Sequence, residues 1–130
     1  TNQEIPNGHA AYIRMIFESL AMKYRETLDV FKTLSEHPIE KLHVIGGGSR
    51  NALLNQFTAN AIGLPVIAGP AEASSVGNIM LQAKAAGIVQ SLQEMRNVIS
   101  ANVELSTYYP QDSELWQAAY IKYRNIIGLH

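Results

Sequence analysis

Three consecutive glycines between an apolar segment and a helix-like segment are the feature of this sequence best suited to binding chemistry. Gly46, Gly47 and Gly48 directly follow the short apolar segment KLHVI. Successive glycines permit positive φ angles and let a ligand come close to the backbone. A helix beginning after them would offer unpaired N–H groups and the positive end of its dipole to a phosphate or another polar acceptor. Asn51, expected in the first turn of that helix, carries an amide that could bond a ribose hydroxyl or a base edge.

Better-known nucleotide motifs fit this segment less well. The spacing G-x-G-x-x-N-A lacks the third glycine of the dinucleotide-binding fingerprint, and no acidic residue follows the second apolar segment at the ribose-binding spacing. The G-K-[ST] sequence of a phosphate-binding P-loop does not occur after the glycines. A bare glycine triplet is also explained by a tight turn between a strand and a helix, with no ligand.

Composition excludes several other kinds of chemistry. The chain of 130 residues has no cysteine, which excludes disulfides, thiolate metal ligands and a cysteine nucleophile, and which fits a reducing compartment such as the cytoplasm. The four histidines do not have the spacing of zinc ligands, so no metal site is predicted. With a net charge of −1, the chain has no broad basic surface for nucleic acid or for an anionic membrane. No apolar run approaches the roughly 20 residues needed to span a bilayer.

The surrounding pattern predicts an α/β chain that is rich in helix. Apolar residues at spacings of three and four predict helices, and short β-branched segments next to glycine or proline predict strands. Ser49 is the expected N-cap of the helix after the glycines, and Gly63 is its expected C-terminal stop. The predicted helices cover 8–34, 50–62, 74–86, 88–103 and 113–127, with strands at 41–45 and 65–68 and an extended segment at 105–110. Two short parallel strands make too small a sheet, so the chain reads like the end of an α/β domain whose first strands are missing.

At the glycine segment the sequence resembles a known family. The run HVIGGGSRNALLNQFTANAIGLPVIAGPAEASSVGNIMLQAKAAG (43–87) is similar to the carboxy-terminal domain of the FGGY carbohydrate kinases. The resemblance extends upstream through RMIFESLAMKYRETL (14–28) and downstream to about Trp116, so it covers nearly the whole chain. Within the family, the similarity is greatest to the branch that phosphorylates L-rhamnulose on its 1-hydroxyl.

This resemblance implies a partial RNase H-like domain of the actin-like ATPase fold, helix-rich with a few short, mainly parallel strands. The family holds ATP between two domains and transfers its phosphoryl group to a sugar hydroxyl, with Mg²⁺ and an aspartate that accepts the hydroxyl proton. By the resemblance, Gly46 and Gly47 shape the turn, Gly48 lies against the nucleotide and Asn51 reaches the adenosine. The segment 72–78 resembles the helix near the interdomain connection.

The resemblance also implies that much of the enzyme is not in this chain. The family's D-x-G-T phosphate loop does not occur, and the catalytic aspartate and most of the sugar site belong to segments upstream. We therefore expect a single domain over residues 1–130, the carboxy-terminal portion of the second, nucleotide-binding domain, with no catalytic residue and no activity alone. A sheet edge left uncovered predicts self-association. The alternative is a helical binding or oligomerisation module in which GGG is only a turn.

Overall fold

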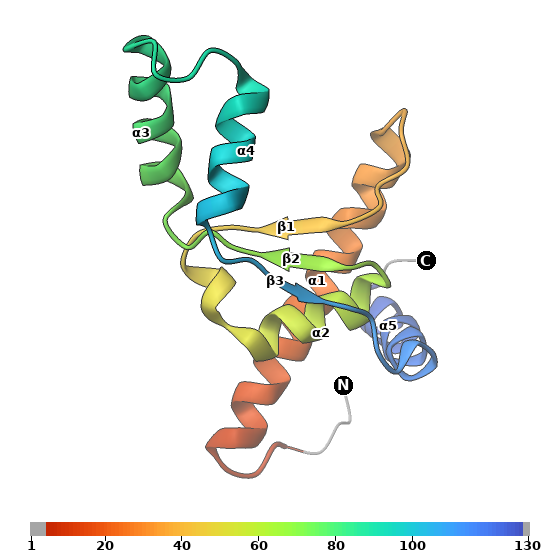
Figure 1. The fold of residues 1–130 in the computed structure, drawn as a ribbon. Helices are drawn as coiled ribbons and strands as arrows, with labels where there is room; N and C mark the ends of the chain where they lie inside the picture. Colours follow the sequence, from red (N-terminus) through yellow and green to blue (C-terminus); the bar gives the residue numbers. More distant parts are fainter. Residues whose placement is uncertain (1–4, 129–130) are drawn as a thin grey trace.

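Three short strands form one sheet that lies against a central helix. The computed structural model describes residues 5–128. Strands β1 (Leu42–Val44), β2 (Val66–Ala68) and β3 (Ser106–Tyr108) lie side by side in that order (Figure 1). β1 and β2 are parallel, which confirms the expected pairing of the two apolar segments. β3 runs antiparallel to β2, so the segment expected only as extended chain makes the sheet mixed.

All five expected helices are present, with one additional short turn. They are α1 (His9–Leu34), α2 (Ala52–Ile62), α3 (Ala73–Ala85), α4 (Leu92–Asn102) and α5 (Ser113–Ile127), and the 3-10 turn η1 (Gly47–Arg50) precedes α2. α4 begins four residues later than expected because Ser91 is its N-cap, with the hydroxyl accepting a hydrogen bond from the Glu94 N–H at 3.1 Å. Among residues 5–128 no helix is long and apolar enough to cross a membrane.

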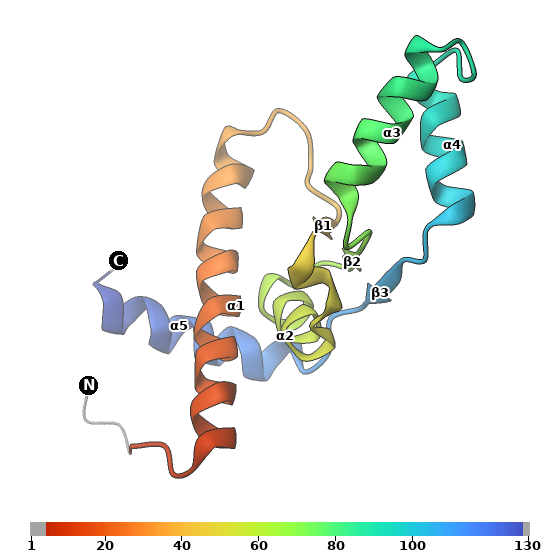
Figure 2. The same cartoon turned by 90° about the vertical axis from the view of Figure 1, so that its left-hand side faces the viewer.

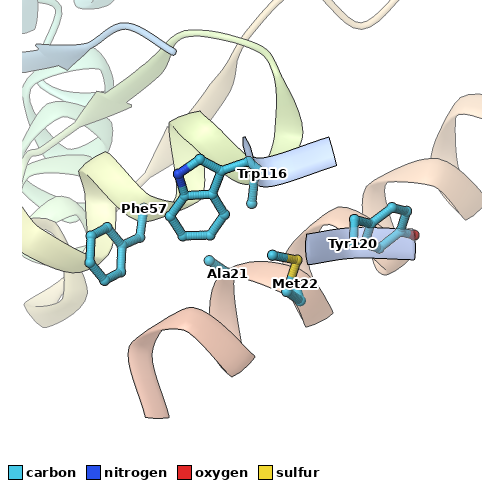
Figure 3. Packing of buried hydrophobic residues seen from close by; sticks show 6 residues of the cluster. Ala21, Met22, Phe57, Trp116 and Tyr120 are labelled. Carbon is cyan, nitrogen blue, oxygen red and sulfur yellow. The ribbon is translucent and has the colours of Figure 1, made fainter. Parts of the chain in front are cut away.

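Helix α2 contributes apolar side chains to two core clusters, one that faces the sheet and one that faces α5. Toward the sheet, Ala59 and Ile62 of α2 pack with Leu28 of α1 and with Val66 of β2. On another side of α2, Phe57 packs with Trp116 of α5, their ring centroids 5.3 Å apart (Figure 3). α2 is therefore the element that fixes the sheet, α1 and α5 relative to one another.

Polar contacts fix the crossing of α1 and α5, which Figure 2 shows. The Tyr120 hydroxyl donates to Asp29 at 3.0 Å, and the Tyr123 hydroxyl donates to Glu26 at 2.8 Å. Burial, together with its hydrogen bond to Glu26, raises the pKa of Tyr123 to about 12. Hydrogen bonds from Lys23 and then from Tyr123 lower the pKa of Glu26. Both shifts stabilise the neutral tyrosine beside the charged carboxylate at neutral pH.

Helices α3 and α4 form a hairpin that projects away from the rest of the chain (Figures 1 and 2). A small separate cluster of Met80, Val89 and Met95 holds the two helices together. The base of α3 lies next to the carboxyl ends of β1 and β2, which brings it to the glycine loop.

One apolar face of α1 is left open among the described residues. The sequence pattern predicts a single apolar stripe along this helix, but the structure buries only its flank at Ala21 and Leu28. Phe17 is partly buried against the core. Five further residues of the stripe are exposed by between 38% and 58%: Ile13, Ile16, Leu20, Tyr24 and Phe31. An apolar face of this length is typical of a contact surface.

Two neighbouring residues of α5 should differ widely in their contribution to the free energy of unfolding. Trp116 is 7% exposed and Leu115 is 68% exposed. We expect Trp116→Ala to lower the free energy of unfolding by about 3–5 kcal/mol, because it leaves a cavity against Phe57. Leu115→Ala should change it by less than about 0.5 kcal/mol. Urea denaturation followed by circular dichroism measures both, and equal losses would contradict the assigned core.

Candidate functional site

The glycine loop is a compact turn closed by its own hydrogen bonds. Gly46 has φ +77°, a conformation that a residue with a Cβ rarely adopts, so the chain reverses there after β1. The backbone N–H of Ser49 donates to the Gly46 carbonyl at 3.0 Å, and the Ser49 hydroxyl donates to the same oxygen at 2.7 Å. The N–H of Asn51 donates to the Gly48 carbonyl at 3.1 Å. Gly47 and Gly48 therefore form the start of a 3-10 turn, which Gly46 precedes, rather than an open loop.

This turn changes the roles expected for Ser49 and Asn51. The sequence predicts Ser49 as the N-cap of α2, and this prediction is wrong. Asn51 is the N-cap instead, with its Oδ1 accepting a hydrogen bond from the Leu54 N–H at 3.0 Å. The physical reason is that η1 uses residues 47–50, so the α-helix begins only at Ala52. Asn51 thus lies just before the helix rather than inside its first turn, while Gly63 ends the helix as expected.

The loop is fastened to the turn that follows β2. The Gly69 N–H donates to the Val44 carbonyl at 2.8 Å, and the Gly46 N–H donates to the Pro70 carbonyl at 3.1 Å. Gly69 has φ +113°, and a Cβ there would lie 3.0 Å from the Glu104 carbonyl oxygen, so the close passage of the chain requires glycine. The sequence predicts a turn over 69–75, and the G-P dipeptide at its start is a turn signal. The close contact of Gly69 with the backbone of Glu104 depends on a distant segment, so the sequence does not reveal it.

An exposed ion pair brings together the two segments that the sequence singled out. The Arg50 guanidinium, at the end of η1, lies 3.4 Å from the carboxylate of Glu72, at the start of α3. Both side chains are more than 70% exposed, so the pair contributes about 0–1 kcal/mol at most to stability. The pair shows instead that segments 46–51 and 72–78, which are separated in sequence, are neighbours in space.

A cavity of about 250 Å³ lies beside Gly48. Its lining is mostly apolar and comes from α1, β1, η1 and α2: Tyr24, Leu42, His43, Val44, Gly48, Leu54, Asn55 and Thr58. A Cβ placed on Gly48 would meet only the Val44 Cγ1, at 3.9 Å. Gly48 is therefore not required by crowding within the chain, and its bare backbone faces space that a ligand could use.

A second cavity, of about 280 Å³, lies between α1, α2 and α5. Two of its charged groups, Arg14 and Glu18, pair with one another: Arg14 Nε donates to Glu18 at 2.7 Å. The Arg14 guanidinium also lies 5.4 Å from the centre of the Phe57 ring. Because none of the residues that line this second cavity belongs to the glycine loop, the cavity beside Gly48 is the stronger candidate.

The described part of the chain offers no assembled catalytic group. No three histidine, aspartate or glutamate side chains within residues 5–128 come close enough together to hold a metal ion. Glu72, at the start of α3, pairs with Arg50. Of the predicted site residues, Gly48 lines the apolar cavity, whereas Gly46, Gly47 and Asn51 are not among its lining residues. An apolar cavity beside bare glycine backbone suits a neutral, partly apolar ligand group such as a nucleoside.

Named relatives match between 85% and 98% of this chain, and the chain spans about a quarter of their length. It is 54% identical over 127 residues to the rhamnulokinase of Bacteroides thetaiotaomicron, which covers 98% of this chain and 26% of that protein. It is 43% identical to the rhamnulokinase of Enterobacter sp. strain 638 and 42% identical to that of Klebsiella pneumoniae, over 85% and 87% of this chain and 22% and 23% of those proteins.

Solved structures share the fold. The crystal structure of xylulose kinase from Rhodospirillum rubrum superposes with a TM-score of 0.73 at 19% identity, over 98% of this chain and 26% of that one. Gluconate kinase from Lactobacillus acidophilus gives 0.64 at 16% identity, over 88% and 24%. The expected actin-like ATPase fold is confirmed. The family described as the FGGY family of carbohydrate kinases, C-terminal domain, matches residues 1–86, and the chain belongs to that family.

Proposed function

We propose that this chain is the adenosine-binding part of an ATP-dependent sugar kinase. In this proposal residues 1–130 are the carboxy-terminal portion of the second, nucleotide-binding domain. The observation that supports it most directly is the closed glycine turn between β1 and α2, with a cavity beside Gly48. The alternative, a helical module with a purely structural turn, does not account for a glycine at position 48, where a Cβ would have room.

Each residue of the loop has a separate task in this proposal. Gly46 and Gly47 shape the turn, and Gly48 lets the nucleoside lie against the backbone. Because the Asn51 oxygen caps α2, its Nδ2 group is the part that would donate to the adenosine. When bound, ATP supplies the phosphoryl group, and segments outside this chain would hold its phosphates, Mg²⁺, the catalytic aspartate and most of the sugar. The chain's contribution is to bind and orient the donor nucleotide.

We propose L-rhamnulose as the substrate, phosphorylated on its 1-hydroxyl, with rhamnose catabolism in the cytoplasm as the setting. The support is the name shared by three relatives that are 42–54% identical to the chain. Transfer from ATP to a sugar hydroxyl is achieved mainly by positioning and electrostatic stabilisation, so it requires both halves of the nucleotide site. The chain alone should therefore bind nucleotide weakly and transfer nothing.

A coupled assay of ADP release tests the substrate. The full-length kinase that carries this chain should phosphorylate L-rhamnulose with a higher kcat/KM than D-xylulose or gluconate. The 130-residue chain alone should give no turnover with any of them. A preference for another sugar would contradict the proposed substrate, and turnover by the chain alone would contradict the division of tasks.

Replacing Gly48 tests the nucleotide site. We expect Gly48→Val in the full-length kinase to raise the KM for ATP at least about tenfold, because the side chain occupies the space proposed for the nucleoside. The melting temperature should change little, since a Cβ at this position meets only Val44 at 3.9 Å. Leu53→Val, at an exposed position on the neighbouring helix, is the control and should leave the KM unchanged. An unchanged KM for ATP in the Gly48→Val variant would remove Gly48 from the site.

We also propose that the isolated chain self-associates through the exposed apolar face of α1. The observation that favours self-association is the row of exposed apolar side chains along α1. Sedimentation of the 130-residue chain should show a dimer or larger species at tens of micromolar. Ile16→Glu should return it to a monomer, because a charge in an apolar contact is costly. Leu81→Glu, on exposed α3, should leave association unchanged. A wild-type monomer at high concentration would contradict the proposal.

A further inference from the structure

A fully buried asparagine lies in the interior of α2. Asn55 is 1% exposed, in a helix whose other buried residues are mostly apolar. An asparagine in a helix interior has a low helix propensity, and burying its amide is unfavourable without hydrogen-bond partners. A leucine of similar size would suit the packing of α2 better. The hydrogen-bond partner of the Asn55 amide should therefore explain why an asparagine is buried here.

The bond that Asn55 makes runs from the helix to the glycine loop. Its Nδ2 donates to the Ser49 carbonyl at 2.9 Å. Ser49 in turn donates twice to the Gly46 carbonyl, through its backbone N–H at 3.0 Å and its hydroxyl at 2.7 Å. A continuous series of hydrogen bonds thus connects the interior of α2 with the residue at which the chain reverses. Asn55 also lines the cavity beside Gly48.

We propose that Asn55 is a positioning residue for nucleotide binding. By holding the Ser49 carbonyl it fixes η1, and with it the backbone of Gly48 and the side chain of Asn51. A loop already fixed in its bound geometry loses less conformational entropy when the ligand binds. The inference rests on the proposed function, because it assumes that adenosine is the ligand of this loop.

The chain provides a matched control on the same helix. Asn60 is also buried, at 7% exposed, but its bonds run elsewhere: its Oδ1 accepts from Gln56 Nε2 at 2.7 Å and from the Gln111 N–H at 2.9 Å. Asn60→Leu therefore removes a buried amide of α2 without touching the glycine loop. Asn55→Leu removes the donor to Ser49, and Asn55→Asp replaces that donor with a carboxylate of the same shape.

Two measurements test the proposal. In the 130-residue chain without ligand, amide hydrogen exchange at Ser49 and Asn51 should be about tenfold faster in both Asn55 variants and unchanged in Asn60→Leu. In the full-length kinase, the Asn55 variants should raise the KM for ATP about tenfold, with the KM for the sugar within about twofold of wild type. Asn60→Leu should leave both KM values within about twofold. Circular dichroism establishes which variants fold, and Asn55→Asp serves where Asn55→Leu does not.

The outcomes separate this inference from the proposed function. If the wild-type kinase is active and folded Asn55 variants have the same KM for ATP as the wild type, the positioning role is overturned. Faster exchange in the loop with an unchanged KM for ATP would overturn it as well. A wild-type full-length protein without ATP-dependent activity would instead overturn the proposed function, and the exchange measurement would then decide alone whether Asn55 fixes the loop.

Discussion

Two backbone hydrogen bonds connect the glycine loop with the turn that leads into α3. They join Val44 to Gly69 at 2.8 Å and Gly46 to Pro70 at 3.1 Å, just beyond the ends of the parallel strands β1 and β2. They continue the strand pairing into the two turns, so the glycine loop and the start of α3 are fixed relative to each other. The exposed Arg50–Glu72 pair adds little to this connection, because both of its side chains are in solvent.

Helix α2 gives these turns a rigid support. Its apolar residues pack toward the sheet, α1 and α5, and its first turn is capped by Asn51 from within the loop itself. The same helix thus anchors the core and presents the loop, and sites supported on regular elements hold their geometry better than sites on mobile loops. The open apolar face of α1 and the projecting α3–α4 hairpin agree with a chain that spans about a quarter of its relatives.

The sequence was sufficient to predict the helices, the first two strands and the location of the loop, because these depend on local periodicity and on glycine. It was not sufficient for features that depend on contacts between distant segments. The strand pairing of Ser106–Tyr108 with β2 is one such feature, and the bond from Asn55 to Ser49 is another. The N-cap assignment failed for a local reason: Ser49 and Asn51 are both good capping residues, and only the 3-10 turn decides between them. The family could be predicted because a long run of the sequence resembles it, and the glycines alone would not have indicated it.

An amide-NMR titration of this chain, first with ADP and then with adenosine, tests the central claim most directly. If the glycine loop is a preformed nucleoside site, both ligands should shift the amide signals of Gly46–Asn51 and of residues lining the cavity beside Gly48. Adenosine alone should suffice, because the chain is proposed to hold the nucleoside and not the phosphates. If neither ligand shifts these signals at millimolar concentration in a folded chain, the claim that these residues form the site by themselves is contradicted.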